Sequence, residues 1–444
     1  MQYNKMWLTG LTALALAGCG GGGGGVQLPS INLVVTGLQV GNSVAVRVEG
    51  SSTGFAQNVG VASAGNTIAA GTSVTDLRPD TYAVSVASHP VRQLCDVIDG
   101  SAVVVNASSQ TVHVQCSVTY LNDTGITAVP AGVSNSDAVY GRDAQALKLS
   151  KIGAGMAGFD YTKLCEGGEL VDASGACPIN NDPNNAWACN RDNVTGLVWA
   201  KSTTTMDTSP AAPADMCGYT DWREPTVHEL VSLVHSGRTS GASFDTNYFT
   251  GNAGVYIASE LYLGGMGRWF VDFAANGAAS DVSGVALDGQ NVRYVASSSR
   301  LNATTTYKRV SVGTEYVIVD TDRDLMWLIS TTPLLTDWEA ALSSASALNL
   351  ANTGGYNDWR LPNKNELDSL VDRSAVNPAV DASVYGDASN ALTFSQSFWS
   401  NSPVTNDNKL SWAMNLQYGD ILPKARTDSA RVVYVRNRVF GTTP

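Results

Sequence analysis

The chain has 444 residues, with 27 Lys or Arg against 39 Asp or Glu, and its formal net charge is −12. Only 15% of the residues are charged and 43 are Gly, which argues against a coiled coil or a helical repeat and favours short strands joined by turns. The acidic balance argues against nucleic acid as the main partner, because nucleic-acid binding depends on a basic surface.

The first 18 residues predict a signal peptide, in which Lys5 precedes an apolar stretch too short to span a bilayer. Residues 16–19, Leu-Ala-Gly-Cys, resemble a bacterial lipobox, so Cys19 is predicted to carry lipid and become the mature N-terminus. An ordinary secretory peptide with an incidental Cys is the alternative. Residues 19–30 are rich in Gly and predict a flexible tether. The expected location is therefore the cell envelope, as an outer-membrane lipoprotein that faces the periplasm or the exterior.

Six further Cys remain, and an even number in an exported chain indicates disulfides. Loop closure favours near neighbours, so the predicted pairs are Cys95–Cys116, Cys165–Cys177 and Cys189–Cys217. A zinc site is the competing interpretation, but it needs closely spaced CxxC or HxxxH pairs, which the sequence lacks.

Residues 31–118 alternate like strands at 31–35, 44–48, 82–86, 102–105 and 111–114, with turn signals between them. This spacing predicts a small antiparallel β-sandwich, stapled near its end by Cys95 and Cys116. The segment carries no cluster of chemically active side chains, so its expected role is a spacer. Residues 119–136 are predicted to be a linker.

Beyond residue 120 the chain repeats itself at an offset of 137 residues. Residues 218–225, GYTDWREP, align with 355–362, GYNDWRLP, and residues 229–234 align with 366–371. Two homologous modules are therefore predicted, at 137–300 and 301–440. Each is expected to place one or two helices on an irregular antiparallel sheet, an α+β class.

Capping boxes predict where the helices of the modules begin. Thr226 with Glu229, and Asn363 with Glu366, each follow a Pro and open a short helix. The second module adds a box at Thr336-x-x-Glu339 and a helix over 340–350, where the first module has only a short loop containing Pro.

The blocks at 196–199, 218–225, 355–362 and 430–436 resemble the Lcl C-terminal domain family, whose domain closes a bacterial collagen-like adhesin. The resemblance implies a C-type-lectin-like fold, extracellular binding of glycans that are often sulfated or otherwise anionic, and sometimes trimers. The expected fold is an N-terminal antiparallel β-sandwich followed by two tandem C-type-lectin-like modules. Module one departs from the pattern, since Glu224 stands where module two has Leu361, which raises the alternative that it is a structural partner.

Two Asp-Trp-Arg triplets invite a catalytic interpretation: Asp221, Trp222 and Arg223, and Asp358, Trp359 and Arg360. Asp358 and Arg360 share strand parity and could pair. The preferred interpretation is structural, a fixed corner between strand and helix. Residues 237–444 contain neither Cys nor His, which removes the usual nucleophile–base pairs. No enzymatic activity is predicted.

Two patterns resemble metal sites without fitting them. His228 and His235 are seven residues apart, where the metalloprotease helix needs four. Asp320-x-Asp322-x-Asp324 begins like a calcium loop, but Leu325 stands where Gly is required and Thr331 where Glu is required. No cofactor is predicted, although a looser calcium site stays open.

The strongest indication of a ligand-binding site is a basic segment near the end of the second module. Residues 409–438 hold six cations and two anions, a net charge of +4 in an acidic protein. Tyr434, Arg436 and Arg438 share strand parity, so an aromatic ring and two cations could occupy one face. The predicted ligand residues are Asn401, Asn406, Asn408, Lys409, Tyr418, Lys424, Arg426, Tyr434, Arg436 and Arg438. A strand edge guarded by charge is the alternative.

These observations predict a lipid-anchored envelope binding protein, or adhesin, that recognises a glycan through its second module. The alternative is a structural or assembly component of the outer envelope that binds another protein. The expected partners are a glycan or a surface protein of the envelope or host, and the membrane only through the lipid. Nucleic acid is not expected, and the oligomeric state is open, a trimer being suggested by resemblance alone.

Overall fold

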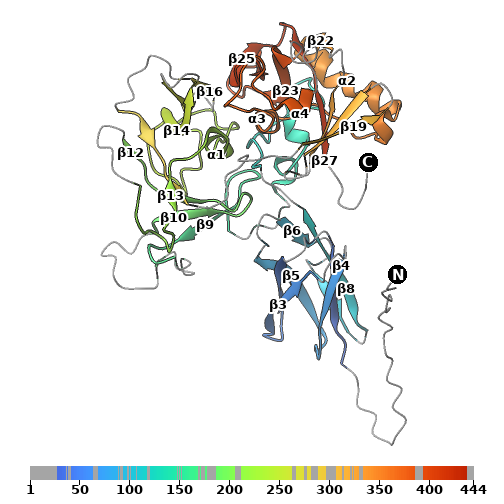
Figure 1. The fold of residues 1–444 in the computed structure, drawn as a ribbon. Coiled ribbons are helices and arrows are strands. Elements are labelled where there is room, and N and C mark those ends of the chain that lie inside the picture. The colour runs from blue at the N-terminus through green and yellow to red at the C-terminus, as the bar shows by residue number, and fades with distance from the viewer. Residues whose placement is uncertain are drawn as a thin grey trace, which may run out of the picture.

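The computed structural model describes residues 28–437, except for 37, 39–41, 64–68, 89, 91–93, 98–99, 101, 107, 118–120, 148, 150, 152, 169–170, 172–175, 178–186, 206–211, 263–266, 275–277, 282–288, 297–306, 313–314, 321–322, 324, 330–333 and 386–393. The predicted signal peptide, Cys19, nearly all of the tether and Arg438 lie outside the described residues. The chain forms a β-sandwich and a larger head above it (Figure 1).

The sandwich is built from two four-stranded sheets. One sheet contains, in spatial order, β4 (Ala69–Val74), β1 (Ile31–Thr36), β8 (Gln110–Ser117) and β6 (Leu94–Val97). The other contains β3 (Ala56–Ala62), β2 (Ser43–Gly50), β5 (Asp80–Ser88) and β7 (Val103–Val105). Alternate residues such as Leu33, Val46 and Val84 form one core between the sheets, as the period-two pattern predicts.

One pair of strands differs from the antiparallel expectation, because β1 and β8 run parallel. Only strands joined by a short hairpin are forced to be antiparallel. β1 and β8 are the first and last strands of the sandwich, so the intervening strands act as the crossover. Cys95 and Cys116 face each other across β6 and β8 and form the predicted disulfide.

Each module of the head has a smaller sheet of its own. In the first module its strands are β13 (Trp222–Arg223), β18 (Val295–Ala296), β11 (Val198–Ala200), β10 (Cys189–Asp192) and β9 (Tyr161–Leu164). In the second module they are β19 (Tyr307–Val312), β20 (Glu315–Asp320), β21 (Leu325–Ile329) and β27 (Tyr434–Asn437). Arg360 takes the place of β13, since it bridges to Val435 as Arg223 pairs with Val295.

A ten-stranded sheet runs through both modules. Its first half contains β12 (Thr204–Thr205), β17 (Asn291–Val292), β14 (Val255–Tyr262), β15 (Gly267–Asp272) and β16 (Ala278–Asp281). Its second half continues with β25 (Asp420–Ala425), β24 (Leu410–Asn415), β23 (Ser397–Pro403), β26 (Ala430–Arg431) and β22 (Leu335–Thr336). The corresponding strands β16 and β25 pair antiparallel at the centre, so the halves are related by a pseudo-two-fold axis.

Two of the three predicted capping boxes are present. Thr226 and Glu229 cap α1 (Val227–Ser232), and Asn363 and Glu366 cap α3 (Lys364–Asp368). The third predicted box does not form. Thr336 pairs in β22, so Asp337 is the N-cap of α2 (Trp338–Leu350), the longest described helix. The remaining helical turns are η1 (Asp137–Val139), η2 (Asp143–Gln145), η4 (Thr353–Gly355) and α4 (Ala382–Tyr385). The head is thus mainly sheet with short helices, which agrees with an α+β class.

The two modules share one hydrophobic core. A single cluster of buried side chains contains Trp199 and Phe273 from the first module and Trp327 and Trp412 from the second. Figure 1 shows the two halves side by side above the sandwich. The modules therefore fold as one head rather than as two separate units.

The segment expected to be a linker is instead part of this head. Asn122 and Thr124 are buried, and the backbone N–H of Ser236 donates to the carbonyl of Thr124 at 2.7 Å. The amide of Asn365 donates to the carbonyl of Asn122 at 2.8 Å, and the amide of Asn122 donates to that of Ser232 at 3.0 Å. Residues 121–126 thus bind helix ends in both modules, which composition alone did not reveal.

Candidate functional site

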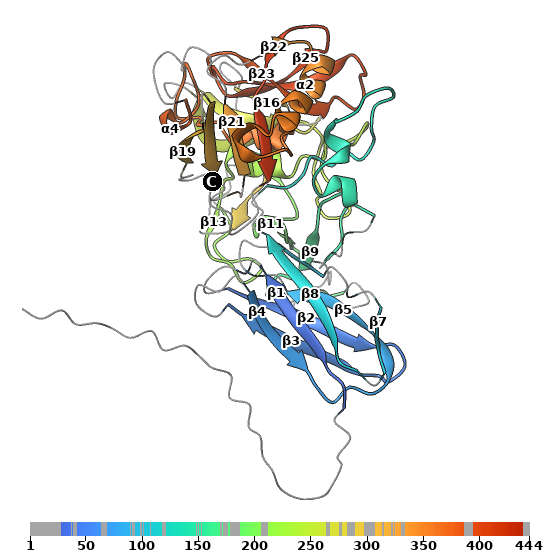
Figure 2. The same ribbon diagram turned by 90° about the vertical axis from the view of Figure 1, so that its right-hand side faces the viewer.

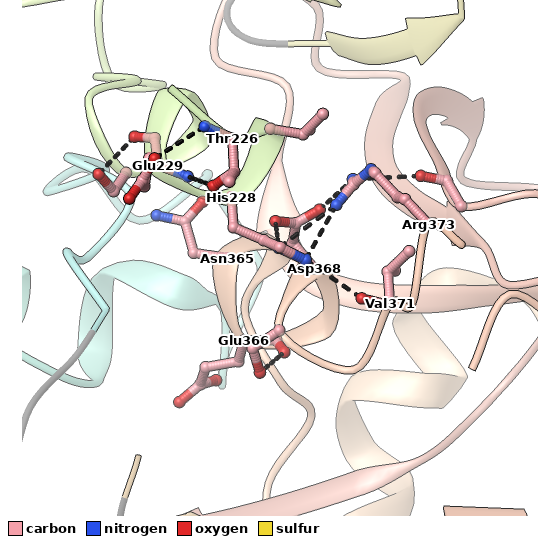
Figure 3. A network of polar contacts seen from close by, with 12 residues as sticks. Thr226, His228, Glu229, Asn365, Glu366, Asp368, Val371 and Arg373 are labelled. Atoms are coloured by element: carbon pink, nitrogen blue, oxygen red, sulfur yellow. Dashed lines mark hydrogen bonds and ion pairs between the residues drawn. The ribbon is translucent and has the colours of Figure 1, made fainter. Parts of the chain in front are cut away.

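A buried polar network joins α1 to the second module (Figure 3). His228 lies with Nδ1 2.5 Å from Oδ2 of Asp368 and Nε2 3.1 Å from the carbonyl of Val371. The guanidinium of Arg373 donates to Oδ1 of Asp368 at 2.5 Å and to the carbonyl of Gly419 at 3.2 Å. We call this group the seam. His228, which resembled a zinc ligand in sequence, instead connects the two modules.

In the seam, neighbouring positive groups offset the cost of burying the carboxylate of Asp368. Burial by itself would raise the pKa of Asp368, but the charge of Arg373 and the ring of His228 outweigh it and hold this pKa well below its usual range. Nearby, Glu260 accepts the backbone N–H of Val227, and burial raises its pKa. The seam is therefore a structural device that keeps one cation and one carboxylate paired away from water.

The Asp-Trp-Arg triplets have contacts that agree with the structural interpretation. Arg223 and Arg360 each make a two-pronged ion pair with the glutamate of the following capping box, Glu229 and Glu366, at 2.6–2.8 Å. The indole N–H of Trp359 donates to the carbonyl of Thr353 at 2.8 Å. Each fork fixes the corner at which a strand ends and a helix begins.

One prediction for the second triplet is wrong, because Asp358 does not pair with Arg360. It pairs with Arg436 at 2.6 and 3.1 Å, since Arg360 is already occupied by Glu366. In the first triplet Asp221 is exposed. Trp222 is buried, and its indole N–H donates to the carbonyls of Met216 and Tyr219.

Three buried carboxylates surround Thr124. Asp123 accepts from the amide of Asn363 at 3.0 Å, and Asp137 accepts from the hydroxyl groups of Thr124 and Ser402 at 2.6 Å. Asp143 accepts the backbone N–H groups of Gly125 and Gly158, both at 2.7 Å. Burial raises the pKa of Asp137 to about 7 and that of Asp143 to about 8, and the neighbouring carboxylates add to both shifts.

Calcium finds little support in the described residues. No group of three His, Cys, Asp or Glu side chains among them has the geometry of a metal site. The buried carboxylates accept hydrogen bonds from N–H and O–H donors of the chain. Of the calcium-like loop, Asp320 pairs with Arg323 at 2.8 Å, and Asp322 and Asp324 lie outside the described residues.

Three of the predicted ligand residues are buried. Asn401 lies in β23 rather than in a loop, and its backbone N–H donates to the carbonyl of Pro362. The hydroxyl of Tyr434 donates to Ser344 of α2 at 2.9 Å. Arg436 lies 4.0 Å above the ring of Tyr356 and pairs with Asp358. The expected shared face of Tyr434 and Arg436 therefore points into the protein, and Arg438 lies outside the described residues.

Five of the remaining predicted residues do gather at one place. Asn406, Asn408 and Lys409 are exposed in the turn between β23 and β24, and the backbone N–H of Arg426 donates to the carbonyl of Lys409 at 2.9 Å. Lys424 lies opposite Ser411 on the neighbouring strand. We call these five residues the hairpin patch. Tyr418 is exposed at the other end of β24, about 20 Å away for a strand of this length.

The structure also has a pocket that the sequence did not reveal. It has a volume of about 390 Å³ and lies in the first module. Its lining residues come from the start of β10, the end of β11, β12, the chain before Cys217 and the residue before β18: Trp187, Ala188, Ala200, Lys201, Ser202, Thr203, Thr204, Pro213, Met216 and Tyr294. The disulfides Cys165–Cys177 and Cys189–Cys217 are both formed as predicted. Two lining residues of the pocket, Ala188 and Met216, directly precede Cys189 and Cys217 in the chain.

Comparison with known proteins accounts for the repeat. A family model described as the Lcl C-terminal domain matches residues 188–296 and again residues 316–436. No curated protein matches the chain in sequence. Among solved structures, a fimbrial protein from Bacteroides ovatus ATCC 8483 is 9% identical over 92% of this chain and 70% of that chain, with a TM-score of only 0.15. Because the family matches span more than half of the chain and confirm the resemblance seen in its motifs, the chain belongs to the Lcl C-terminal domain family and contains two copies of that domain.

Proposed function

We propose that the protein is an adhesin-like binding protein of the cell envelope. In this proposal it is attached through lipid on Cys19 and recognises an acidic glycan with the hairpin patch. Membership of the family suggests an adhesin-like surface protein, and three disulfides indicate an oxidising compartment. No described helix is long and apolar enough to cross the bilayer. The short helices and irregular sheets of each module are compatible with the expected lectin-like fold.

The observation that carries this proposal is that the cations of the hairpin patch lack close carboxylate partners among the described residues. Six arginines elsewhere in the head pair with carboxylates: Arg223, Arg268, Arg323, Arg360, Arg373 and Arg436. In the hairpin patch, by contrast, Lys424 meets only the exposed Asp428, at 3.4 Å. Among the described residues, no carboxylate within ion-pair distance holds Lys409 or Arg426. These charges are available to the sulfate or carboxylate groups of a glycan.

A buried aromatic ring orients one cation of the patch, and amide groups lie beside it. The guanidinium of Arg426 lies 4.2 Å above the ring of Trp338 and donates to Ser411 at 2.9 Å, which fixes its orientation. Asn406 and Asn408 offer adaptable hydrogen bonds beside it. β25 lies at the end of the head that is farthest from sandwich strands β3 and β5 in both views (Figures 1 and 2). An anchor before the sandwich would therefore present the patch outward.

A glycan-array screen of the full exported chain tests the proposal. Lys409→Glu with Lys424→Glu should abolish binding to acidic glycans and leave the melting temperature nearly unchanged, because both side chains are at the surface. The control Arg78→Glu with Lys308→Glu makes the same charge change at exposed positions away from the patch and should retain binding. Binding should also weaken as salt rises. Full binding by the patch variant would place the site elsewhere.

A second candidate is a contact with another envelope protein. β22 is an edge strand of the ten-stranded sheet, and Leu334 and Leu335 are exposed there by 46% and 55%. Open edges with apolar side chains favour association with another chain. If no glycan binds, Leu334→Ser with Leu335→Ser should reduce cross-linking of the protein to its neighbours in intact cells. Unchanged cross-linking would remove this candidate.

A further inference from the structure

The pocket of the first module lies on a sheet face that is covered by a helix in the second module. β11 corresponds to β21 and β18 to β27, so Ala200 corresponds to Leu328 and Tyr294 to Tyr434. Leu328 and Tyr434 belong to the core cluster that contains Trp338 and Leu342 of α2. In the described part of the first module, no helix lies over Ala200 and Tyr294, and the pocket opens there.

Trp187 in the wall of the pocket is flanked by two cations, of which Lys201 also lines the pocket. The ammonium nitrogen of Lys163 lies 3.7 Å, and that of Lys201 3.8 Å, from the centre of the Trp187 ring. Among the described residues, no carboxylate lies within ion-pair distance of either ammonium. Partial burial lowers the pKa of Lys163, and the charge of Lys201 lowers it further. An anion in the pocket beside Lys201 would offset this repulsion.

The backbone around these groups is held rigidly. The carbonyl of Lys201 accepts from the guanidinium of Arg293 at 2.6 Å and from the backbone N–H of Thr250 at 3.0 Å. The backbone N–H of Lys201 donates to the carbonyl of Ala188 at 2.9 Å. The indole N–H of Trp187 meets no acceptor among the described residues, so a donor remains at the ring. A site that is fixed before binding loses less entropy when a ligand binds.

We propose that this pocket binds a small organic anion, with a ring or short apolar body against Tyr294 and the other apolar lining residues and its acidic group beside Lys201. The volume suits a ligand of this size, since small-molecule pockets are about 300–1,000 Å³. Ala188, Ala200, Pro213 and Met216 supply an apolar lining, whereas Lys201 supplies the charge. This site is separate from the hairpin patch, so either proposal can fail alone.

Ligand-observed NMR titrations of the full exported chain test the proposal. Benzoate and cyclohexanecarboxylate should bind, and their neutral amides should not. Lys201→Met should weaken benzoate binding about tenfold, as expected for a lost hydrogen bond to a charged group. Lys308→Met removes an exposed cation from another sheet and is the matched control. Comparing glucuronate with benzoate shows whether the ring can be a sugar or must be apolar.

A second variant protects the test against misfolding. Ser202 is an exposed residue of the pocket lining, so Ser202→Glu should fold normally and place a competing carboxylate beside the lysines. By pairing with Lys201, the introduced carboxylate should remove benzoate binding while the melting temperature stays unchanged. Equal binding of acids and amides, unchanged binding by Lys201→Met and Ser202→Glu, or no binding by any acid would each overturn the proposal.

Discussion

Breaking the seam should destabilise the head far more than breaking an ion pair at its surface. Asp368→Asn removes the only negative charge paired with the guanidinium of Arg373 among the described residues and leaves it neutral neighbours: an amide oxygen, the carbonyl of Gly419 at 3.2 Å, the ring of His228 at 3.3 Å and the face of Trp269 at 5.0 Å. The side chain of Arg373 is 2% exposed, so water cannot compensate for the lost carboxylate. Removing one partner of a buried pair costs about 3–5 kcal/mol, a large part of the roughly 5–15 kcal/mol that stabilises a typical domain.

Denaturant unfolding followed by tryptophan fluorescence measures this loss. Residues 31–118 contain no Trp, so the signal reports the head and not the sandwich. The control is Asp428→Asn, which breaks the exposed contact with Lys424 and should cost at most about 1 kcal/mol. Asp368→Leu with Arg373→Met should be less destabilising than the sum of the single changes, because an uncharged pair leaves no buried charge. A loss for Asp368→Asn that is no larger than the control would refute the reasoning.

Two further predictions concern the acid cluster and the anchor. Burial raises the pKa of Asp143 to about 8, so the folded chain holds a proton that the unfolded chain releases near pH 4, and the stability from this residue is lost as pH rises from about 4 to about 8. Asp143→Asn should make the fall in unfolding free energy with pH shallower by up to about 1.4 kcal/mol per pH unit. The unfolding free energies of both proteins would be measured at about pH 5, 6 and 7. Equal slopes for the variant and the unchanged protein would contradict the prediction. Cys19→Ala should move the protein from the detergent-extracted membrane fraction to soluble fractions or leave it unprocessed, and unchanged fractionation would argue against a lipid anchor.

Features that depend on nearby residues were predictable from the sequence. The two capping boxes that form each span four residues, and all three disulfides join Cys within 28 residues of each other. The family resemblance depended on short motifs in the same way. Local geometry determines such features, so a motif and its spacing are enough to predict them.

The binding surface was harder to predict because burial depends on distant partners. Tyr434 and Arg436 lie in one strand as expected, but Ser344 and Asp358, which bind them, are 90 and 78 residues away in sequence. The seam gave one signal that was missed. Asp368 stands where the first repeat has Val231, and a charge on the apolar face of one copy alone indicates a partner in the other copy. The buried segment 121–126 gave no comparable signal.

The shared core of the two domain copies explains why their outer surfaces differ while their buried residues correspond. Trp199 and Trp327 occupy matching positions in the repeats and contribute to the same hydrophobic cluster, so a change in either affects both halves. The outer faces carry no such constraint. The second module places α2 over one face of its small sheet, whereas the corresponding face of the first module forms a pocket with Lys201 in its wall. One duplicated domain therefore presents a hairpin patch from one copy and a pocket from the other on a common rigid base. Since the core is shared, each surface has to be tested by substitutions in the full chain and not by separating the modules.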